Sequence, residues 1–208
     1  AGDLTVSVLT FGAIIQEIRL AGVPHGLALG SDVLADYEDK MGYFGAIVGP
    51  IANRISNARV RLDGMMYELE RNENGQTHLH SGADGCHRKI WRLITQTADS
   101  VTLGLKMPDG AAGLPGQREI TVTYRVNAPA TLTMTIDGTT DTTTCMNFAS
   151  HLYWNLDGTQ TWAGHQLRVA ADHFLPVDDS VCPTGEVVAV AGTDMDFRET
   201  RVPEIGAP

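Results

Sequence analysis

Charged residues are scarce in this chain: only 19% of its 208 residues are Asp, Glu, Lys or Arg, and the formal net charge is −10. The few Lys and Arg residues are not clustered along the sequence. An acidic chain without a basic cluster repels phosphate backbones and anionic lipid headgroups. We therefore expect neither nucleic acid nor a membrane as a partner, and a neutral small ligand suits the charge better.

Cysteines are few as well, and Cys86, Cys145 and Cys182 lie far apart without a Cys-x-x-Cys pair. This spacing favours neither a disulfide framework nor a thiolate metal site. The chain begins without the basic and apolar regions of a signal peptide, and no apolar run reaches the length of a membrane span. We expect a cytoplasmic protein. The first residue is not Met and the chain stops without a closing element, so we also expect a fragment.

Heptads, repeats and low-complexity tracts are absent from the sequence, helix signals are nearly absent, and Gly and Thr are plentiful. Short alternating segments separated by turn residues are typical of strands. Many short strands with a turn about every ten residues predict an all-β fold, a large antiparallel β-sandwich, with residues 1–208 as a single domain. The expected strands are 4–10, 13–20, 27–29, two strands within 60–71 around Asp63-Gly64, 90–95, 101–107, 117–126, 132–137, 165–171 and 187–190.

The stretch Asn147 to Gly158 contains the first candidate site. It is predicted to be a short strand closed by an Asp-Gly turn, which places His151, Tyr153 and Asn155 on one face. An imidazole, a phenol and an amide on the same face are suited to holding and protonating a hydroxyl-rich ligand. The alternative is a half-buried strand with a histidine that is simply hydrogen-bonded.

Two further segments carry polar side chains in unusual settings. Glycines and a proline interrupt the apolar segment Gly42–Ile55, which closes on Asn53 and Arg54. Their amide and guanidinium groups can donate to the oxygens of a ligand, although an ordinary exposed loop arginine is an equal alternative. The segment contains neither a Gly-x-Gly-x-x-Gly motif nor a phosphate-binding lysine, so a phosphate site is not supported.

The second segment, Thr77 to Gly82, contains His78 and His80, which would share a face if the chain is extended there. With Asp84 nearby, one interpretation is a metal site of the cupin kind. Others are a purely structural pair and a site for a polar ligand, which we favour.

Taken together, these segments resemble the aldose 1-epimerase (galactose mutarotase) family, and the resemblance covers almost the whole chain. The order and spacing of several motifs carry it: Gly49-Pro50-Ile51-Ala52-Asn53-Arg54-Ile55, Leu62-Asp63-Gly64, His78-Leu79-His80-Ser81-Gly82 followed by Gly85 and Trp91, Asp109-Gly110 to Pro115-Gly116, Val122-Thr123-Tyr124, and Asn147 to Gly158.

The resemblance implies a β-supersandwich that binds a free hexose of the glucose or galactose type and interconverts its α and β anomers without a cofactor or metal. It places sugar-contacting residues at Asn53 and Arg54, the first site histidine at His80, and the general acid at His151, with Tyr153 beside it. A histidine suits this acid role because its pKa near 6.5 lets it give and retake a proton around neutral pH.

This sequence departs from the family in one important way. In the family the general base is a glutamate near the C-terminus, and the chain stops before it. We expect a fragment that lacks the C-terminal part; the alternative is a non-catalytic sugar-binding paralogue. Smaller departures are Ser81 in place of a common glycine and Trp154 in place of another aromatic residue. The sequence carries no signal for an oligomeric state.

Overall fold

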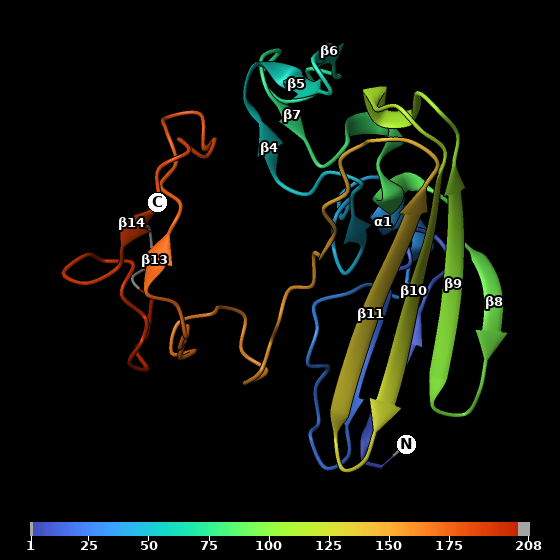
Figure 1. Cartoon of the computed structure of the whole chain (residues 1–208). Helices are drawn as coiled ribbons and strands as arrows, with labels where there is room; N and C mark the ends of the chain where they lie inside the picture. The colour runs from blue at the N-terminus through green and yellow to red at the C-terminus, as the bar shows by residue number, and fades with distance from the viewer. Residues whose placement is uncertain (1, 204–208) are drawn as a thin grey trace. The chain divides into compact units, whose positions relative to one another are not determined.

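A hairpin of two antiparallel strands opens the computed structural model, which describes residues 2–203 (Figure 1). Strand β1 (Leu4–Val8) pairs with β2 (Ile15–Leu20), and the register shifts between Ser7 and Val8. The pairing confirms the two strands that the alternation of the sequence predicts. The chain divides into two units, residues 1–154 and 155–208, and each is described by itself; the single domain expected over 1–208 stays a prediction.

A four-stranded antiparallel sheet forms the larger layer of the first unit, in the order β11-β10-β9-β8 (Figure 1). Its strands are β8 (Arg92–Gln96), β9 (Ser100–Met107), β10 (Arg118–Asn127) and β11 (Thr131–Thr140). Short turns join β8 to β9 and β10 to β11, and a longer loop joins β9 to β10, as the turn residues of the sequence predict.

The core of the first unit lies between the β1–β2 hairpin and this sheet. Alternate residues of β10 are buried, because successive side chains of a strand point to opposite faces. They share one apolar cluster with residues of the hairpin and of neighbouring segments: Leu4, Ile15, Ile18, Trp91, Leu103, Ile120, Val122 and Tyr124. The all-β sandwich predicted from the sequence is confirmed.

Short strand pairs connect these layers to the part of the unit that carries the polar motifs. They are β3 (Ile47–Val48) with β12 (Ala149–Ser150), β4 (Arg54–Ile55) with β7 (His78–Leu79), and β5 (Arg59–Leu62) with β6 (Met65–Glu68). The last pair is the predicted hairpin around Asp63-Gly64. Short 3₁₀ turns cover Ser56–Ala58, Gly82–Asp84, Cys86–Arg88 and Ala111–Gly113.

A short helix, α1 (Leu34–Glu38), forms although helix signals are nearly absent from the sequence. It contains five residues, and its Tyr37 side chain is buried. The Tyr37 hydroxyl accepts a hydrogen bond from the backbone N–H of Ser31. The expected strand 27–29 is reduced to a single bridge between Ala28 and Trp154. The burial of the Tyr37 side chain therefore favours a helical turn here, and the alternation of the sequence does not reveal it.

In the described part of the second unit, residues 155–203, β13 (His173–Phe174) pairs with β14 (Val188–Ala189). The expected strand 165–171 is present only as a bridge between Leu167 and Arg201. Arg198 binds the carboxylates of Asp196 and Asp172. In this unit, turns and ion pairs predominate over sheet.

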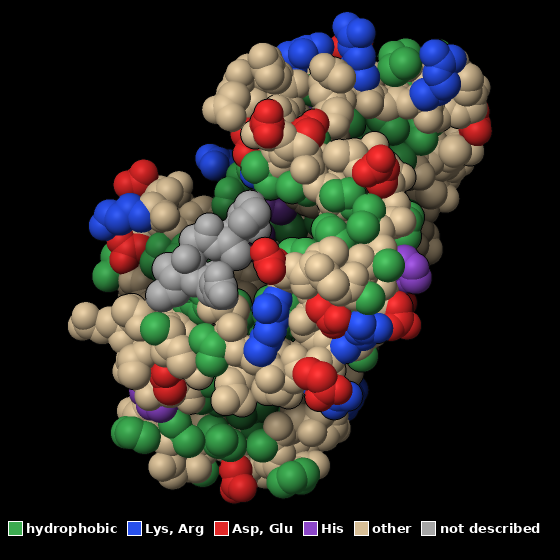
Figure 2. Space-filling view, turned by 90° about the vertical axis from the view of Figure 1, so that its left-hand side faces the viewer, with side chains coloured by type: hydrophobic (Ala, Val, Ile, Leu, Met, Phe, Trp, Pro, Cys, Tyr) green, Lys and Arg blue, Asp and Glu red, His purple; other side chains and the backbone are tan. Residues whose placement is uncertain are grey.

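Strand β11 is an edge of the four-stranded sheet, and among residues 2–203 no strand pairs with its other side. Most of its ten residues are exposed, and hydrophobic side chains also reach the surface elsewhere, as on the face shown in Figure 2. An unpaired edge of this length is a template for pairing with another chain. We therefore expect the 208-residue chain to self-associate at micromolar concentration.

Thr135→Lys on β11 should reduce this association, since a charge on an edge strand opposes edge-to-edge pairing. Light scattering and size-exclusion chromatography measure it. Thr161→Lys, in a loop outside the strands, is the control with the same added charge and should have little effect. A monomeric wild-type chain with a sharp, reversible thermal transition would contradict the prediction.

Candidate functional site

The backbone around His151 is held by hydrogen bonds that continue the β3–β12 pair. The N–H of His151 donates to the carbonyl of Ala46 at 2.8 Å, and its carbonyl accepts from the N–H of Gly45 at 3.0 Å. Gly45 has a φ of +67°, and a Cβ there would lie 2.2 Å from the carbonyl oxygen of Ile15. Only glycine fits this close approach, so the segment that supports His151 depends on it.

His80 follows the β4–β7 pair and leaves the extended conformation, with a φ of +50°. Its partner across the pair, Asn53, also has a positive φ, +64°. The two residues are joined twice: the N–H of His80 donates to the Asn53 carbonyl at 3.1 Å, and the N–H of Asn53 donates to His80 Nδ1 at 3.0 Å. Because Nδ1 accepts a hydrogen bond, the neutral His80 ring carries its proton on Nε2.

Ser81 anchors the chain immediately after His80. It has a φ of +64°, and its side chain is buried. The Ser81 hydroxyl accepts from the N–H of Ile51 at 2.8 Å and lies 3.3 Å from the Ile51 carbonyl, to which it donates. The serine that replaces a common glycine of the family therefore ties the His80 loop to the segment that carries Asn53.

The rings of His80 and His151 meet edge to face, with their centroids 5.2 Å apart. The Tyr153 ring lies 5.2 Å from that of His151, and Phe44 stacks on Tyr153 at 4.3 Å. His151 and Tyr153 thus lie together as the alternation predicts, although β12 itself ends at Ser150. Two imidazoles that are 71 residues apart in the sequence therefore belong to one cluster.

Arg54 stands beside Asn53 and is fixed by a carboxylate. Its Nε donates to Glu73 Oε2 at 2.7 Å and its Nη2 donates to Glu73 Oε1 at 2.8 Å, a bidentate pair. Its Nη1 lies 3.3 Å from the side-chain oxygen of Asn53, to which it donates. Arg54 and Glu73 are both about one-fifth exposed, so their charges lie at the margin of the protein interior.

Burial lowers the pKa of two histidines in this cluster, His80 and His87. It lowers the pKa of His80 to about 4, with the charges of His151 and Arg54 adding to the effect and Glu73 opposing it. It also lowers the pKa of His87 to about 4, with smaller contributions from Arg88, His80 and His151. Desolvation disfavours the charged form of an imidazole. His80 and His87 are therefore neutral at physiological pH.

This arrangement predicts that the protein loses stability in weak acid. An unfolded histidine has a pKa near 6.5, so between pH 6.5 and 4 the unfolded state binds protons that the folded state does not. The stabilisation is fully present above pH 6.5 and is lost as the pH falls. For His87, a shift from 6.5 to about 4 corresponds to a loss of about 2 kcal/mol between pH 7 and 5.

Urea unfolding of the wild type and of His87→Phe at pH 7 and pH 5 tests this. The phenyl ring preserves an aromatic contact but cannot bind a proton. The free energy of unfolding should fall by about 2 kcal/mol more in the wild type than in the variant. Equal losses in both proteins would show that His87 does not contribute.

His78 and His80 do not share a face, because the chain turns at His80. His78 is fully buried within β7, and its Nδ1 hydrogen-bonds the carbonyl of Glu70 at 2.8 Å. Burial lowers its pKa as well. The condition under which the two histidines would share a face, an extended chain through His80, is therefore not met, and the contacts of His78 are those of a structural residue. Within residues 2–203, no group of three or more His, Cys, Asp or Glu side chains is arranged to hold a metal ion.

The sequence reasoning does not single out Tyr43, His87 or Glu73, which the structure places beside the expected residues. The Tyr43 ring lies 5.0 Å from His80, 4.8 Å from His87 and 5.5 Å from His151. The sequence signal for Tyr43 is its position near the start of the glycine-interrupted segment Gly42–Ile55.

Asn155 lies in the second unit, where its side chain accepts a hydrogen bond from the N–H of Gly158. That Asn155 shares a face with His151 and Tyr153 therefore stays a prediction.

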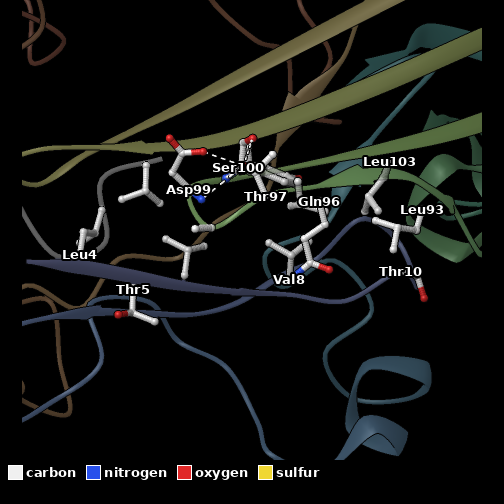
Figure 3. A pocket seen from close by; sticks show the side chains of 15 residues that line it. Leu4, Thr5, Val8, Thr10, Leu93, Gln96, Thr97, Asp99, Ser100 and Leu103 are labelled. Carbon is white, nitrogen blue, oxygen red and sulfur yellow. Dashed lines mark hydrogen bonds between the residues drawn. The ribbon is translucent and has the colours of Figure 1, made fainter. Parts of the chain in front are cut away.

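A separate hollow lies between β1 and the β8–β9 hairpin (Figure 3). It has a volume of about 310 Å³, and Leu4, Val8, Leu93 and Leu103 are among the residues around it. None of the histidines lines it. Polar residues such as Thr5, Gln96 and Asp99 line it as well. It contains none of the candidate residues identified from the sequence, so the histidine cluster is the candidate site and not this hollow.

Comparison with known proteins identifies the family. Residues 1–205 match the aldose 1-epimerase family. The chain is 32% identical over 203 residues to an aldose 1-epimerase of Escherichia coli K12 and 34% identical over 204 residues to a galactose mutarotase of Bos taurus. These alignments cover 96% and 95% of this chain.

Two solved structures show the same fold. An aldose epimerase homologue from C. elegans superposes with a TM-score of 0.90 at 36% identity, over 95% of this chain and 62% of that one. A galactose 1-epimerase from Lactobacillus acidophilus NCFM superposes with a TM-score of 0.83 at 27% identity, over 96% of this chain and 59% of that one.

The chain belongs to the aldose 1-epimerase family. It spans 58% of the length of the curated relatives that it matches. No helix among residues 2–203 is long and apolar enough to cross a membrane.

Proposed function

We propose that the protein is an aldose 1-epimerase that interconverts the α and β anomers of a free hexose of the glucose or galactose type. The observation that carries the proposal is the edge-to-face contact of the His80 and His151 rings at 5.2 Å. Arg54 and Asn53 join this cluster through the hydrogen bond from Asn53 to His80. The expected site residues thus form one group in a member of the family.

In the proposed reaction the ring of the sugar opens and closes again. His151 gives a proton to the ring oxygen while the anomeric hydroxyl loses one to a base, and the C1–O5 bond breaks to leave an open-chain aldehyde. After rotation about the C1–C2 bond, O5 attacks the other face of the carbonyl and the two protons return. The reaction is redox-neutral, and groups of this kind contribute on the order of 10²–10⁴-fold each.

His80, Arg54, Asn53 and Tyr153 bind the sugar in this proposal. The Nε2–H of neutral His80 donates to a sugar oxygen, and the Arg54 guanidinium, fixed by Glu73, polarises a neighbouring one. The family resemblance assigns the base to a glutamate without a counterpart in residues 1–208. We therefore expect the 208-residue chain alone to bind a hexose but to turn it over poorly.

Polarimetry of freshly dissolved α-D-glucose and α-D-galactose tests the proposal in the full-length protein. An epimerase accelerates the approach to the equilibrium rotation. A sugar-binding protein without turnover leaves this rate unchanged but binds the hexose in isothermal titration calorimetry. If the protein neither accelerates the exchange nor binds the hexose, both functions are refuted.

His80→Asn separates a sugar-binding role of His80 from a structural one. The asparagine oxygen can accept from the N–H of Asn53 as Nδ1 does, and asparagine tolerates the φ of +50°. The variant lacks the Nε2–H donor, so we expect hexose affinity to fall by up to about tenfold and the rate to fall with it, while the melting temperature stays close to that of the wild type. Calorimetry and polarimetry measure these changes, with His173→Asn as the exposed control. Unchanged affinity would favour a structural role.

A further inference from the structure

Tyr43 and Phe44 form a consecutive aromatic pair that faces the alternating pair His151 and Tyr153. Tyr43 stacks on His151 with an angle of 25° between the ring planes, and Phe44 stacks on Tyr153 with an angle of 26°. Stacked rings at these distances attract each other beyond what burial alone contributes. The two stacks together hold both side chains of the His151 face against one segment.

The backbone gives this segment a fixed position relative to His151. The N–H of Ala46 donates to the carbonyl of Tyr43 at 3.1 Å, which closes a turn over residues 43–46. The next residues of the same turn hold His151 through its N–H and its carbonyl. The same turn therefore forms hydrogen bonds to the backbone of His151 and carries the ring that stacks on its side chain.

The Tyr43 ring also lies against two other imidazoles of the cluster. Its centroid lies 5.0 Å from His80, edge to face, and 4.8 Å from His87. The His87 side chain is nearly completely buried, and it leaves no space for a Cβ at Gly85, which would lie 2.5 Å from His87 Nδ1. His87 therefore packs closely against the Gly85 backbone as well as against Tyr43. The phenol ring is confined among three imidazoles.

We infer that Tyr43 is a positioning residue of the proposed epimerase: its ring sets the orientation of the His151 imidazole relative to His80. This inference rests on the proposed function. A proton donor that is displaced by about 1 Å can lose on the order of 10²-fold in rate, so the contact that orients it affects catalysis without touching the sugar. The contribution comes from the aromatic ring, not from the Tyr43 hydroxyl.

Tyr43→Phe and Tyr43→Leu, made in the full-length protein, test the inference. Tyr43→Phe keeps the ring, and its kcat should stay within about twofold of the wild type. Tyr43→Leu removes the ring, and its kcat should fall by about tenfold or more while KM changes by less than about threefold, because the groups proposed to bind the sugar remain. If Tyr43→Leu does not fold, Tyr43→Met supplies a flexible, unbranched side chain that can fill an irregular space.

Imidazole NMR signals give a second measurement that does not depend on turnover. The Tyr43 ring should shift the ring protons of His151 upfield in the wild type and in Tyr43→Phe, and this shift should be lost in Tyr43→Leu or Tyr43→Met. Wild-type kcat in a folded Tyr43→Leu or Tyr43→Met variant would overturn the inference. So would a loss in Tyr43→Phe as large as that in Tyr43→Leu, because it would assign the role to the hydroxyl.

The two proposals can fail separately. If the wild type does not accelerate anomer exchange, the proposed function fails, and the NMR comparison still decides whether the Tyr43 ring packs on His151. An unchanged His151 signal in the leucine and methionine variants would overturn the positioning role even in an active enzyme.

Discussion

Replacing His151 by alanine is expected to slow anomer exchange by at least about a hundredfold in the full-length protein. The expectation follows from the proposed role of His151 as the acid at the ring oxygen, since a positioned acid typically contributes on the order of 10²–10⁴-fold. The His151 backbone is held by Gly45 and Ala46 and not by its side chain, so the fold should survive the substitution. Polarimetry measures the rate, and circular dichroism and thermal unfolding check the fold.

His173→Ala is the matched control, because His173 is an exposed histidine in β13 of the second unit. It should retain the wild-type rate. Hexose affinity should fall much less than the rate in His151→Ala, because removal of a proton donor affects the transition state more than the bound ground state. A near wild-type rate in a folded His151→Ala protein would show that another group is the acid.

Removing the Arg54 guanidinium is expected to have the second-largest effect. Hydrogen bonds to charged groups contribute about 1.5–3 kcal/mol, so kcat/KM should fall by roughly 10- to 100-fold in Arg54→Met. The substitution also deprives the Glu73 carboxylate of its bidentate partner. Glu73 has a lowered pKa, chiefly because of its hydrogen bonds to Arg54, and this pKa should rise in the variant.

Arg54→Lys and Arg59→Met sharpen this experiment. Lysine keeps the positive charge but cannot reproduce the planar fork, so Arg54→Lys should lose most of the activity that Arg54→Met loses. Arg59 forms an exposed ion pair with Glu68 at 2.8 Å, and exposed pairs contribute little. Arg59→Met should therefore match the wild type in steady-state kinetics. Full activity of Arg54→Met would contradict a role for Arg54 at the sugar.

The strands that the sequence predicts best are those joined by local turns. The pairs β5–β6, β8–β9 and β10–β11 connect neighbouring segments, and their alternation and turn residues act over a few positions. The helix α1 and the reduction of the expected strand 27–29 to a bridge at Ala28 are not predicted, because the burial of Tyr37 and the contact with Trp154 depend on distant parts of the chain. Long-range contacts override weak local preferences.

The candidate site also contains residues that the sequence identifies and others that only the structure reveals. The family resemblance identifies Asn53, Arg54, His80, His151 and Tyr153 as candidates, and the structure brings their segments together through β3–β12 and β4–β7. Glu73 could not be selected, because many carboxylates in the sequence have the same local appearance. Only the bidentate geometry with Arg54 distinguishes it.

The amino-acid sequence alone determined the all-β class, the local hairpins and the residue types of the site, because side-chain alternation, turn chemistry and motif spacing are local properties of a chain. The tertiary structure alone decided how the neighbouring residues His80 and His78 come to lie in different surroundings. It turns the backbone at His80 to a φ of +50° and buries His78 against Glu70. It also decided that Tyr43 and His87 complete the cluster, since contacts between residues far apart in a chain are set by packing and leave no periodic signal in the sequence.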